Sequence, residues 1–479
     1  MEKRVFGATD GVRGKAGEWP LTEGAVRRLG GAVAKWFGEN EESEQGVRIL
    51  VGRDTRESGE WIAREICRGI REAGGEVVET GVLMTPALQK LIERDEEAVG
   101  GVMITASHNP AEENGLKVFK ANGDKLSDEE ELGVEEKFFE LGEEDDKAGV
   151  RENGIGEKED GVEGTESGEN GDLEDGENGS DDEGDDAVGV YVSLVRDLLG
   201  QREVRGAKIV LDAAAGAGHD FSRRVFEDFG VEVEQIDAEP DGRNINSGCG
   251  ALYPEKVAEK ARELGCVGVA LDGDADRIVL ADEEGRVWSG DRIVVLLAEY
   301  LAKRNALRGG AVVLTEYSNL ATIKYLEERG IRVEKVVNGD RFVVEKCHEI
   351  GAGLGGELSG HIIYLPWLES SDGTAMALFV LKIIGEENCQ LADLWADYED
   401  YPSKQWGIKV VEKREFGEIA GFTEAIERAR EELGESGRVF IRYSGTENKM
   451  RILAEGEDLE MVEKIGESLA EIVKKEIGA

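Results

Sequence analysis

The sequence contains no apolar run long enough to span a bilayer and no apolar signal segment near its start. Cysteine is scarce. The five cysteines are scattered, odd in number and without the spacing of a metal site (Cys67, Cys249, Cys266, Cys347 and Cys389). This usage is typical of proteins kept in a reducing compartment. We therefore expect a cytoplasmic protein without a membrane partner.

Basic residues are few compared with acidic ones. The chain has 58 lysines and arginines against 104 aspartates and glutamates, a net charge of −46. Setting aside residues 152–186, which hold 16 acidic residues and one lysine, still leaves −31, so the acidity is general. Such an excess disfavours nucleic acid and anionic membranes as partners. It resembles protein surfaces in organisms that keep high internal salt, where screening relieves self-repulsion; salt adaptation is our hypothesis.

Strand and helix patterns alternate along the 479 residues, which are enough for several domains. The strand–helix–strand pattern recurs three times, at 48–52, 61–73 and 76–80, at 208–212, 221–229 and 231–235, and at 311–315, 319–329 and 332–336. Repeats of this size indicate parallel or mixed sheets covered by helices, the α/β class. Residues 152–186 are glycine-laced and almost devoid of apolar side chains, so we predict a disordered insertion there.

A serine and a histidine follow the apolar run that ends at residue 104, in the sequence Thr-Ala-Ser-His-Asn-Pro at 105–110. Chemistry in α/β proteins usually lies in loops at strand ends. Ser107 is therefore placed to present its hydroxyl to a cleft beside His108. The alternative is a polar turn in which the serine only caps a helix.

Three aspartates alternate with small residues after the apolar strand predicted at 267–271. Asp272, Asp274 and Asp276 can converge on one point because the residues between them let the backbone curl. Carboxylate oxygens suit a hard divalent cation, and we favour Mg²⁺. The alternatives are an acidic surface turn or a calcium loop. A calcium loop needs glycine at its sixth position, where Arg277 stands.

A glycine-rich loop at 355–361 carries Glu357, Ser359 and His361. These side chains offer donors and acceptors suited to sugar hydroxyls. Taken alone, such a loop is weak evidence for a binding site.

A second polar loop, at 442–448 with Arg451 beyond it, supplies two guanidinium groups, two hydroxyls and glycine-exposed amides. That combination is suited to a phosphate monoester. The alternative is an ordinary turn between strands at 439–441 and 451–454.

In this order, the four motifs resemble those of the α-D-phosphohexomutase family, and the likeness covers nearly the whole chain outside the acidic segment. Residues 6–14 resemble the family's opening sequence with one extra residue, Ala8. Within the family, the chain is most similar to members that act on glucosamine phosphates; the supporting segments are 14–16, 244–250, 339–342 and 361–363. Two departures, Ala275 in place of a frequent glycine and Asn448 in place of a frequent proline, remove no ligand.

The resemblance implies a four-domain architecture: three similar α/β domains with mixed sheets and a smaller α+β C-terminal domain, arranged around a central cleft. The expected domains are 1–150 with the serine loop, 188–290 with the metal loop, 291–397 with the sugar loop and 398–479 with the phosphate loop. Residues 151–187 form the expected insertion.

The resemblance also implies an isomerase that moves a phosphoryl group between the C6 and C1 oxygens of a hexose phosphate. Ser107 would rest as phosphoserine, phosphorylate the sugar to a bisphosphate and take back the other phosphate. Asp272, Asp274 and Asp276 would hold Mg²⁺ together with a phosphoserine oxygen. A sugar bisphosphate is a candidate activator.

The resemblance assigns further roles. His108, Lys117 and Arg13 would lie beside the phosphoryl group, and His361 would act as an acid or base. Substrate contacts would come from Arg277, Glu357 and Ser359, and the phosphate not being transferred would be held by Arg442, Ser444, Gly445, Thr446 and Arg451.

Three functions remain open from the sequence. The first is a mutase for glucosamine phosphates, and the second is a mutase for mannose or glucose phosphates with the same residues. The third is a non-catalytic sugar-phosphate binder, which the presence of Ser107 together with all three aspartates argues against. The sequence leaves the oligomeric state open between a monomer and a homodimer.

Overall fold

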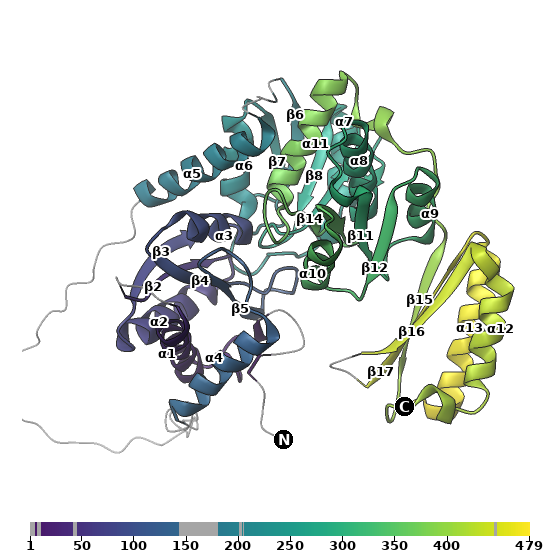
Figure 1. Ribbon diagram of the computed structural model, residues 1–479, viewed down its shortest axis with the longest axis horizontal. Helices are drawn as coiled ribbons and strands as arrows, with labels where there is room; N and C mark the ends of the chain where they lie inside the picture. Colours follow the sequence, from purple (N-terminus) through teal and green to yellow (C-terminus); the bar gives the residue numbers. More distant parts are fainter. Residues whose placement is uncertain are drawn as a thin grey trace, which may run out of the picture. The chain divides into compact units, whose positions relative to one another are not determined.

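The computed structural model describes residues 5–6, 11–41, 46–142, 181–200, 204, 206–444 and 448–479. The chain divides into two compact units. Met1–Val287 and Tyr364–Ala392 belong to the first, and Trp288–Ile363 and Asp393–Ala479 belong to the second. Each unit is built from two β-sheets covered by helices (Figure 1).

The first sheet of the first unit has the order β1-β5-β4-β2-β3. Its strands are β1 (Val12–Lys15), β2 (Arg48–Arg53), β3 (Glu76–Val82), β4 (Ala98–Ile104) and β5 (Glu113–Lys120); its helices are α1 (Glu23–Asn40), α2 (Gly59–Glu72), α3 (Thr85–Arg94) and α4 (Asp128–Glu140). β2 runs parallel to β3 and β4, whereas β5 is antiparallel to β4 and β1. β4 is buried along its whole length, which explains its unbroken apolar sequence.

The second sheet has the order β10-β9-β8-β6-β7. Its strands are β6 (Lys208–Asp212), β7 (Glu232–Ile236), β8 (Val267–Leu271), β9 (Ile278–Ala281) and β10 (Val287–Trp288). Helices α5 (Asp181–Leu199), α6 (Gly218–Asp228) and α7 (Glu255–Leu264) and the short 3₁₀ helix η2 (Gly250–Leu252) accompany them. β6 is parallel to β7 and β8, and β9 is antiparallel to β8. As in the first sheet, the central strand β8 is fully buried.

Helix α11 (Gly373–Glu387) lies within the first compact unit; the domain expected at residues 291–397, which includes it, stays a prediction. It contacts β8, β9 and α5. Asp372 caps its start by accepting the backbone N–H of Ala375, and the same carboxylate accepts the Tyr191 hydroxyl of α5 at 2.7 Å. The chain therefore returns to the second sheet after forming most of the third.

The second unit contains the sheet β12-β11-β13-β14 and the antiparallel sheet β15-β17-β16. The first consists of β11 (Ala311–Thr315), β12 (Arg332–Val336), β13 (Leu354–Gly356) and β14 (Ile362–Tyr364), with α8 (Gly290–Lys303), α9 (Leu320–Glu328), α10 (Asp340–Ile350) and the turn η3 (Arg308–Gly310). The second consists of β15 (Ser403–Lys409), β16 (Gly437–Tyr443) and β17 (Lys449–Gly456), with α12 (Phe422–Leu433), α13 (Leu459–Ile477) and the turns η4 (Leu391–Leu394), η5 (Phe416–Glu418) and η6 (Gly434–Ser436). Helices α12 and α13 cover one face of this sheet (Figure 1).

Three mixed α/β sheets and an antiparallel C-terminal sheet confirm the predicted fold class. Most of the predicted acidic insertion, residues 151–180, lies outside the described residues, but α5 begins at Asp181, inside the predicted segment. Among the described residues, no helix is both long and apolar enough to cross a membrane.

Candidate active site

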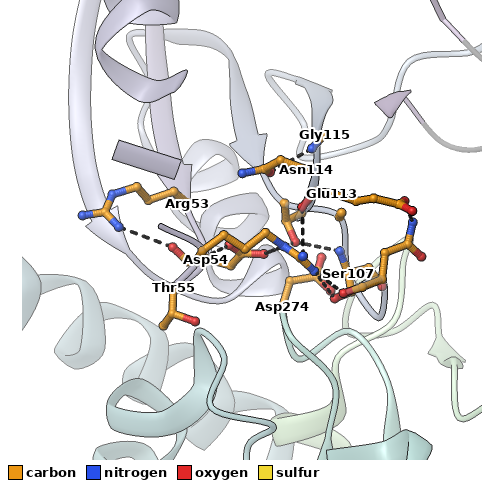
Figure 2. A network of polar contacts seen from close by, with 12 residues as sticks. Arg53, Asp54, Thr55, Ser107, Glu113, Asn114, Gly115 and Asp274 are labelled. Atoms are coloured by element: carbon orange, nitrogen blue, oxygen red, sulfur yellow. Dashed lines mark hydrogen bonds and ion pairs between the residues drawn. The ribbon is translucent and has the colours of Figure 1, made fainter. Parts of the chain in front are cut away.

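Ser107 lies in the turn that follows β4, where its backbone takes the left-handed conformation, with φ +51°. Its hydroxyl donates to Asp272 Oδ2 at 2.8 Å and lies 3.3 Å from His108 Nδ1. Its own N–H donates to Thr105 Oγ1 at 2.8 Å. Figure 2 shows Ser107 beside Asp274 within a network of polar contacts. The structure therefore joins the serine loop to the aspartate loop.

Asp272, Asp274 and Asp276 are buried and each offers an oxygen within 4.8 Å of the others. The loop that carries them follows β8. Ala275 has φ +60°, which explains why glycine is frequent there in the family. A side chain on Gly273 would place its Cβ 2.5 Å from the Ser107 carbonyl oxygen, so the close approach of the two loops requires glycine.

Lys117, on β5, compensates part of this negative charge. Its ammonium donates to Asp274 Oδ2 at 2.8 Å and to Asp276 Oδ2 at 2.9 Å. Thr85 Oγ1 also donates to Asp274 Oδ2, at 2.6 Å, whereas Asp274 Oδ1 is buried without a hydrogen-bond partner among the described residues. An unpartnered buried carboxylate oxygen in an all-oxygen cluster fits Mg²⁺, which prefers oxygen ligands.

Two predicted arginines also lie at this site. Arg13, on β1, donates from Nη1 to the Ala106 carbonyl at 2.5 Å. Arg277 donates its backbone N–H to Asp272 Oδ1 at 3.2 Å, and its Nε lies 3.9 Å from Asp272 Oδ2. The first unit thus brings together around Ser107 the predicted residues Arg13, His108, Lys117, Asp272, Asp274, Asp276 and Arg277, whereas His361, also predicted to be catalytic, belongs to the second unit.

Several residues that support the serine and aspartate loops were not predicted from the sequence, namely Asp54, Arg56, Thr85 and Asn246. Asp54 and Arg56 follow β2, which runs parallel to β4, so their loop lies at the same sheet edge as Ser107. The sequence Gly-Arg-Asp-Thr-Arg at 52–56 after an apolar strand was the available signal. Polar residues that follow two neighbouring parallel strands, here β2 and β4, can be interpreted as parts of one site.

Glu357 and His361 form a buried pair in the loop between β13 and β14 of the second unit. His361 Nδ1 lies 2.8 Å from Glu357 Oε2, which also accepts the Ser359 hydroxyl at 2.9 Å. The other carboxylate oxygen, Oε1, accepts the Gly339 N–H at 2.8 Å. Burial opposes ionisation of Glu357, but the hydrogen bond and charge of His361 outweigh it, so the pKa of Glu357 lies below its usual value. The loop therefore presents an ionised carboxylate.

Arg442 on β16 and Arg451 on β17 are directly opposite each other in the antiparallel ladder. Opposite residues project from the same face of a sheet, so both guanidinium groups lie on one face. Arg442 Nε donates to the Tyr317 hydroxyl at 2.7 Å. Ser444 is buried, and its carbonyl accepts a hydrogen bond from Lys413 Nζ at 2.6 Å. Neither Tyr317 nor Lys413 was predicted from the sequence. Gly445 and Thr446 lie outside the described residues.

Four family models match almost the whole chain in order. They are described as Phosphoglucomutase/phosphomannomutase alpha/beta/alpha domain I at residues 3–145, domain II at 190–285, domain III at 289–401 and the C-terminal domain at 407–472. The matched domains, the fold and the loops described above define a phosphohexomutase, an isomerase that acts as an intramolecular phosphotransferase.

The chain belongs to the phosphoglucomutase/phosphomannomutase, or α-D-phosphohexomutase, family. It is 37% identical to the phosphoglucosamine mutase of Anaeromyxobacter dehalogenans over 480 residues and 36% identical to that of Bdellovibrio bacteriovorus over 483 residues, with 100% of each chain covered. A family protein of Burkholderia thailandensis has the same fold, with a TM-score of 0.72, 20% identity and coverage of 98% and 96%. An N-acetylphosphoglucosamine mutase of Aspergillus fumigatus, in complex with GlcNAc-6P and magnesium, also has this fold. Its TM-score is 0.58 at 18% sequence identity, and the match covers 82% of this chain and 93% of that one.

Proposed function

We propose that this phosphohexomutase interconverts glucosamine 6-phosphate and glucosamine 1-phosphate through a phosphorylated Ser107, for amino-sugar nucleotide synthesis. The observation that carries the chemistry is the 2.8 Å contact between Ser107 Oγ and Asp272 inside the aspartate cluster. The choice of sugar is supported by full-length relatives, 36–37% identical, that are named phosphoglucosamine mutases. A cytoplasmic location remains a prediction.

The proposed reaction has two transfers. In the first, the bond between phosphorus and Ser107 Oγ breaks while the oxygen of the free sugar hydroxyl bonds to that phosphorus, and the proton of that hydroxyl passes to the released Ser107 Oγ. The resulting bisphosphate then reorients in the site. In the second, Ser107 Oγ attacks the other phosphate, and the sugar oxygen released takes up a proton.

The charges around Ser107 suit such transfers. Asp272, Asp274 and Asp276 would hold Mg²⁺, which would supply positive charge to the transferring phosphoryl group. Lys117 lies within hydrogen-bond distance of two of these carboxylates, so its ammonium would stand beside the same group. Arg13 and Arg277 add two further cations next to the serine and aspartate loops. His108 Nδ1, 3.3 Å from Ser107 Oγ, would bind a phosphoserine oxygen or carry its proton.

The second unit would bind the rest of the substrate. Arg442 and Arg451, paired on one face of the C-terminal sheet, would grip the phosphate that is not transferred, whichever end of the sugar it occupies. Glu357 would accept sugar hydroxyls. Its ionised state also suits the ammonium group of glucosamine, although mutases for neutral sugars in this family share a glutamate there, so Glu357 does not fix the sugar. His361 is the proposed acid or base of this loop.

The test is a coupled assay of phosphorylated enzyme with Mg²⁺ and a trace of sugar bisphosphate. Glucosamine 6-phosphate, mannose 6-phosphate and glucose 6-phosphate are compared, and we expect glucosamine 6-phosphate to have the highest kcat/KM. A preference for either neutral sugar by more than about tenfold, or ~1.4 kcal/mol of transition-state discrimination, would assign the enzyme to mannose or glucose phosphates instead.

The serine mechanism is tested in the same assay. Ser107→Ala should lower kcat by roughly 10³-fold or more, because the nucleophile is lost. Ser127→Ala is the matched control: Ser127 only caps α4, accepting the Glu130 N–H, so this variant should lose some stability but no activity. A fall in kcat of less than tenfold in Ser107→Ala would exclude the phosphoserine mechanism. If the wild-type protein converts none of the three sugar phosphates, the remaining function is that of a non-catalytic sugar-phosphate binder.

A further inference from the structure

The fully buried Arg56 holds the serine loop through four of its backbone carbonyls. Its Nη2 donates to the carbonyls of Ser107 at 3.0 Å and Asn109 at 2.8 Å. Its Nη1 donates to the Glu113 carbonyl at 2.9 Å and also to that of Pro110. Arg56 is 1% exposed. One guanidinium group therefore fixes the whole turn from Ser107 to the start of β5.

Asp54 holds Arg56 in place from the opposite side. Arg56 Nε donates to Asp54 Oδ2 at 2.9 Å, and the Arg56 N–H donates to Asp54 Oδ1 at 3.0 Å. Asp54 Oδ2 also accepts the Thr105 hydroxyl at 2.7 Å, so the carboxylate bonds both to Arg56 and to the end of the serine loop (Figure 2). Both side chains of the ion pair have 0% exposure. A buried ion pair gains little net stability from its charges, so its contribution here is geometric.

Asn246, in the domain that contains the second sheet, donates to two of the carbonyls that Arg56 also contacts. Its Nδ2 donates to the Ser107 carbonyl at 2.8 Å and to the Asn109 carbonyl at 3.2 Å. Asn246 is 7% exposed and has φ +58°, a conformation that asparagine tolerates better than most residues. The Ser107 carbonyl also lies against Gly273 of the aspartate loop, because a Cβ there would be 2.5 Å away.

These contacts explain how Ser107 keeps a strained backbone. A non-glycine residue with positive φ costs on the order of 1–3 kcal/mol and persists only where its surroundings determine it. Two donors from different domains meet at the carbonyl of Ser107 itself. They fix the direction of the Ser107 side chain with respect to Asp272, which lies one hydrogen bond away.

We propose that Arg56 and Asn246 are positioning residues for phosphoryl transfer: together they clamp the Ser107 loop onto the aspartate loop and set the direction of the Ser107 oxygen. This inference rests on the proposed function of Ser107. Neither side chain touches the reacting atoms. Their loss should therefore slow the chemical step while substrate binding, carried by other residues, persists.

The first test is the variant Arg56→Lys. The lysine keeps one positive charge beside Asp54 but cannot donate to four carbonyls. We expect kcat to fall about 30-fold or more, since a displacement of ~1 Å in a reacting group can cost about 100-fold, while KM changes by less than about threefold. Arg28→Lys is the matched control. Arg28 is buried in α1, which packs on α2 and α4, and its guanidinium carbon lies 4.9 Å from the centroid of the Phe138 ring. It should lower the melting temperature and leave kcat unchanged.

The second test is Asn246→Gly, which tolerates the positive φ and removes the side chain together with its donor. We expect kcat to fall about tenfold at unchanged KM. The double variant should lose less than the product of the two single losses, because both side chains bond the same two carbonyls. Rates are divided by the fraction of Ser107 phosphorylated, measured by intact mass, and taken well below each melting temperature.

Three results would overturn the inference: a wild-type kcat in Arg56→Lys, a loss confined to KM, or an equal loss of kcat in Arg28→Lys. Failure of the proposed function is distinguishable from these, because it would appear in the wild-type enzyme as absent turnover or an unphosphorylated Ser107.

Discussion

Ser107 and the three aspartates show how opposing charges are balanced at the scale of single residues. Three buried carboxylates within 4.8 Å repel one another; the Lys117 ammonium contacts two of them, and Arg277 Nε lies 3.9 Å from the third. The three carboxylates outnumber these two cations, and a divalent cation would offset the remaining repulsion. Phosphorylation of Ser107 would add nearly two further negative charges. We infer that the metal requirement strengthens when the serine is phosphorylated.

Replacing Asp274→Asn should weaken Mg²⁺ binding by about tenfold or more while keeping the fold. One ligand charge is lost, but the repulsion within the cluster also falls. The measurement is Mg²⁺ affinity by calorimetry, together with the Mg²⁺ concentration for half-maximal activity. Asp241→Asn, an exposed loop residue of the same unit, is the control and should change neither. Unchanged Mg²⁺ affinity in Asp274→Asn would place the metal elsewhere.

At this scale the sequence singled out the candidate chemical residues but not the residues that hold their loops. Ser107 and Asp272 stand out because their residue types fit chemistry at a strand end. Arg56 and Asn246 act through hydrogen bonds to backbone carbonyls, and the partner of such a bond has no sequence signature. Only the parallel pairing of β2 with β4 brings Arg56 under the serine turn.

At the scale of elements, strand limits were predicted most accurately. The strands predicted at 208–212, 267–271, 311–315 and 332–336 have the observed bounds of β6, β8, β11 and β12. β6, β8 and β11 are short apolar runs between turn residues, which fix their limits, whereas β12 is a more exposed edge strand. The packing of α11 on the second sheet was not predictable in the same way, because its apolar sequence suits burial against any sheet. Which sheet it covers depends on contacts distant in sequence.

Helices α8 and α9 of the second unit are joined through a buried carboxylate. Asp291, in the first turn of α8, accepts the backbone N–H of Asn319, the N-cap of α9, at 2.7 Å. Burial raises the pKa of Asp291 to about 6, despite the hydrogen bond from the Asn319 N–H, which favours the ionised form. The nearby carboxylates of Asp400 and Glu455 raise it further, and burial raises their own pKa values.

A raised pKa means that the folded state holds the proton more tightly than the unfolded state. The stabilisation from protonated Asp291 is complete below pH 3.8 and is lost as the pH rises through about 6. The loss is on the order of 3 kcal/mol. Asp291→Asn keeps an acceptor for Asn319 and removes the charge, so it should raise the urea midpoint at pH 8 more than at pH 5.

The control for this prediction is Glu399→Gln, which removes the exposed carboxylate next to Asp400. It should shift the urea midpoints at pH 5 and pH 8 little. Part of the pH dependence should survive in Asp291→Asn because Asp400 and Glu455 still titrate in the same direction. An equal shift of the midpoint at pH 5 and pH 8 would show that Asp291 is not the titrating group.

For the molecule as a whole, the net charge of −46 is the property that the fold explains least. Many surface carboxylates are paired with arginine or lysine, as in Arg243–Glu57 and Arg68–Glu72. Exposed pairs of this kind contribute little to stability. With 104 acidic residues and 58 basic ones, one-to-one pairing would still leave 46 acidic residues over, so self-repulsion should destabilise the compact state in dilute buffer.

Salt should therefore stabilise the protein. Between about 10 mM and 1 M KCl the Debye length falls from ~30 Å to ~3 Å, so repulsion between separate surface carboxylates is largely screened. We expect the melting temperature to rise by roughly 5 °C or more. A chain lacking residues 152–180 should keep most of this response, since removing the 11 acidic residues and one lysine of that segment still leaves a net charge of −36. If the full chain melts at the same temperature in both buffers and is no more active in molar KCl, its acidity is not an adaptation to salt. If the shortened chain alone loses the response, the repulsion resides in the acidic segment and not in the folded surface.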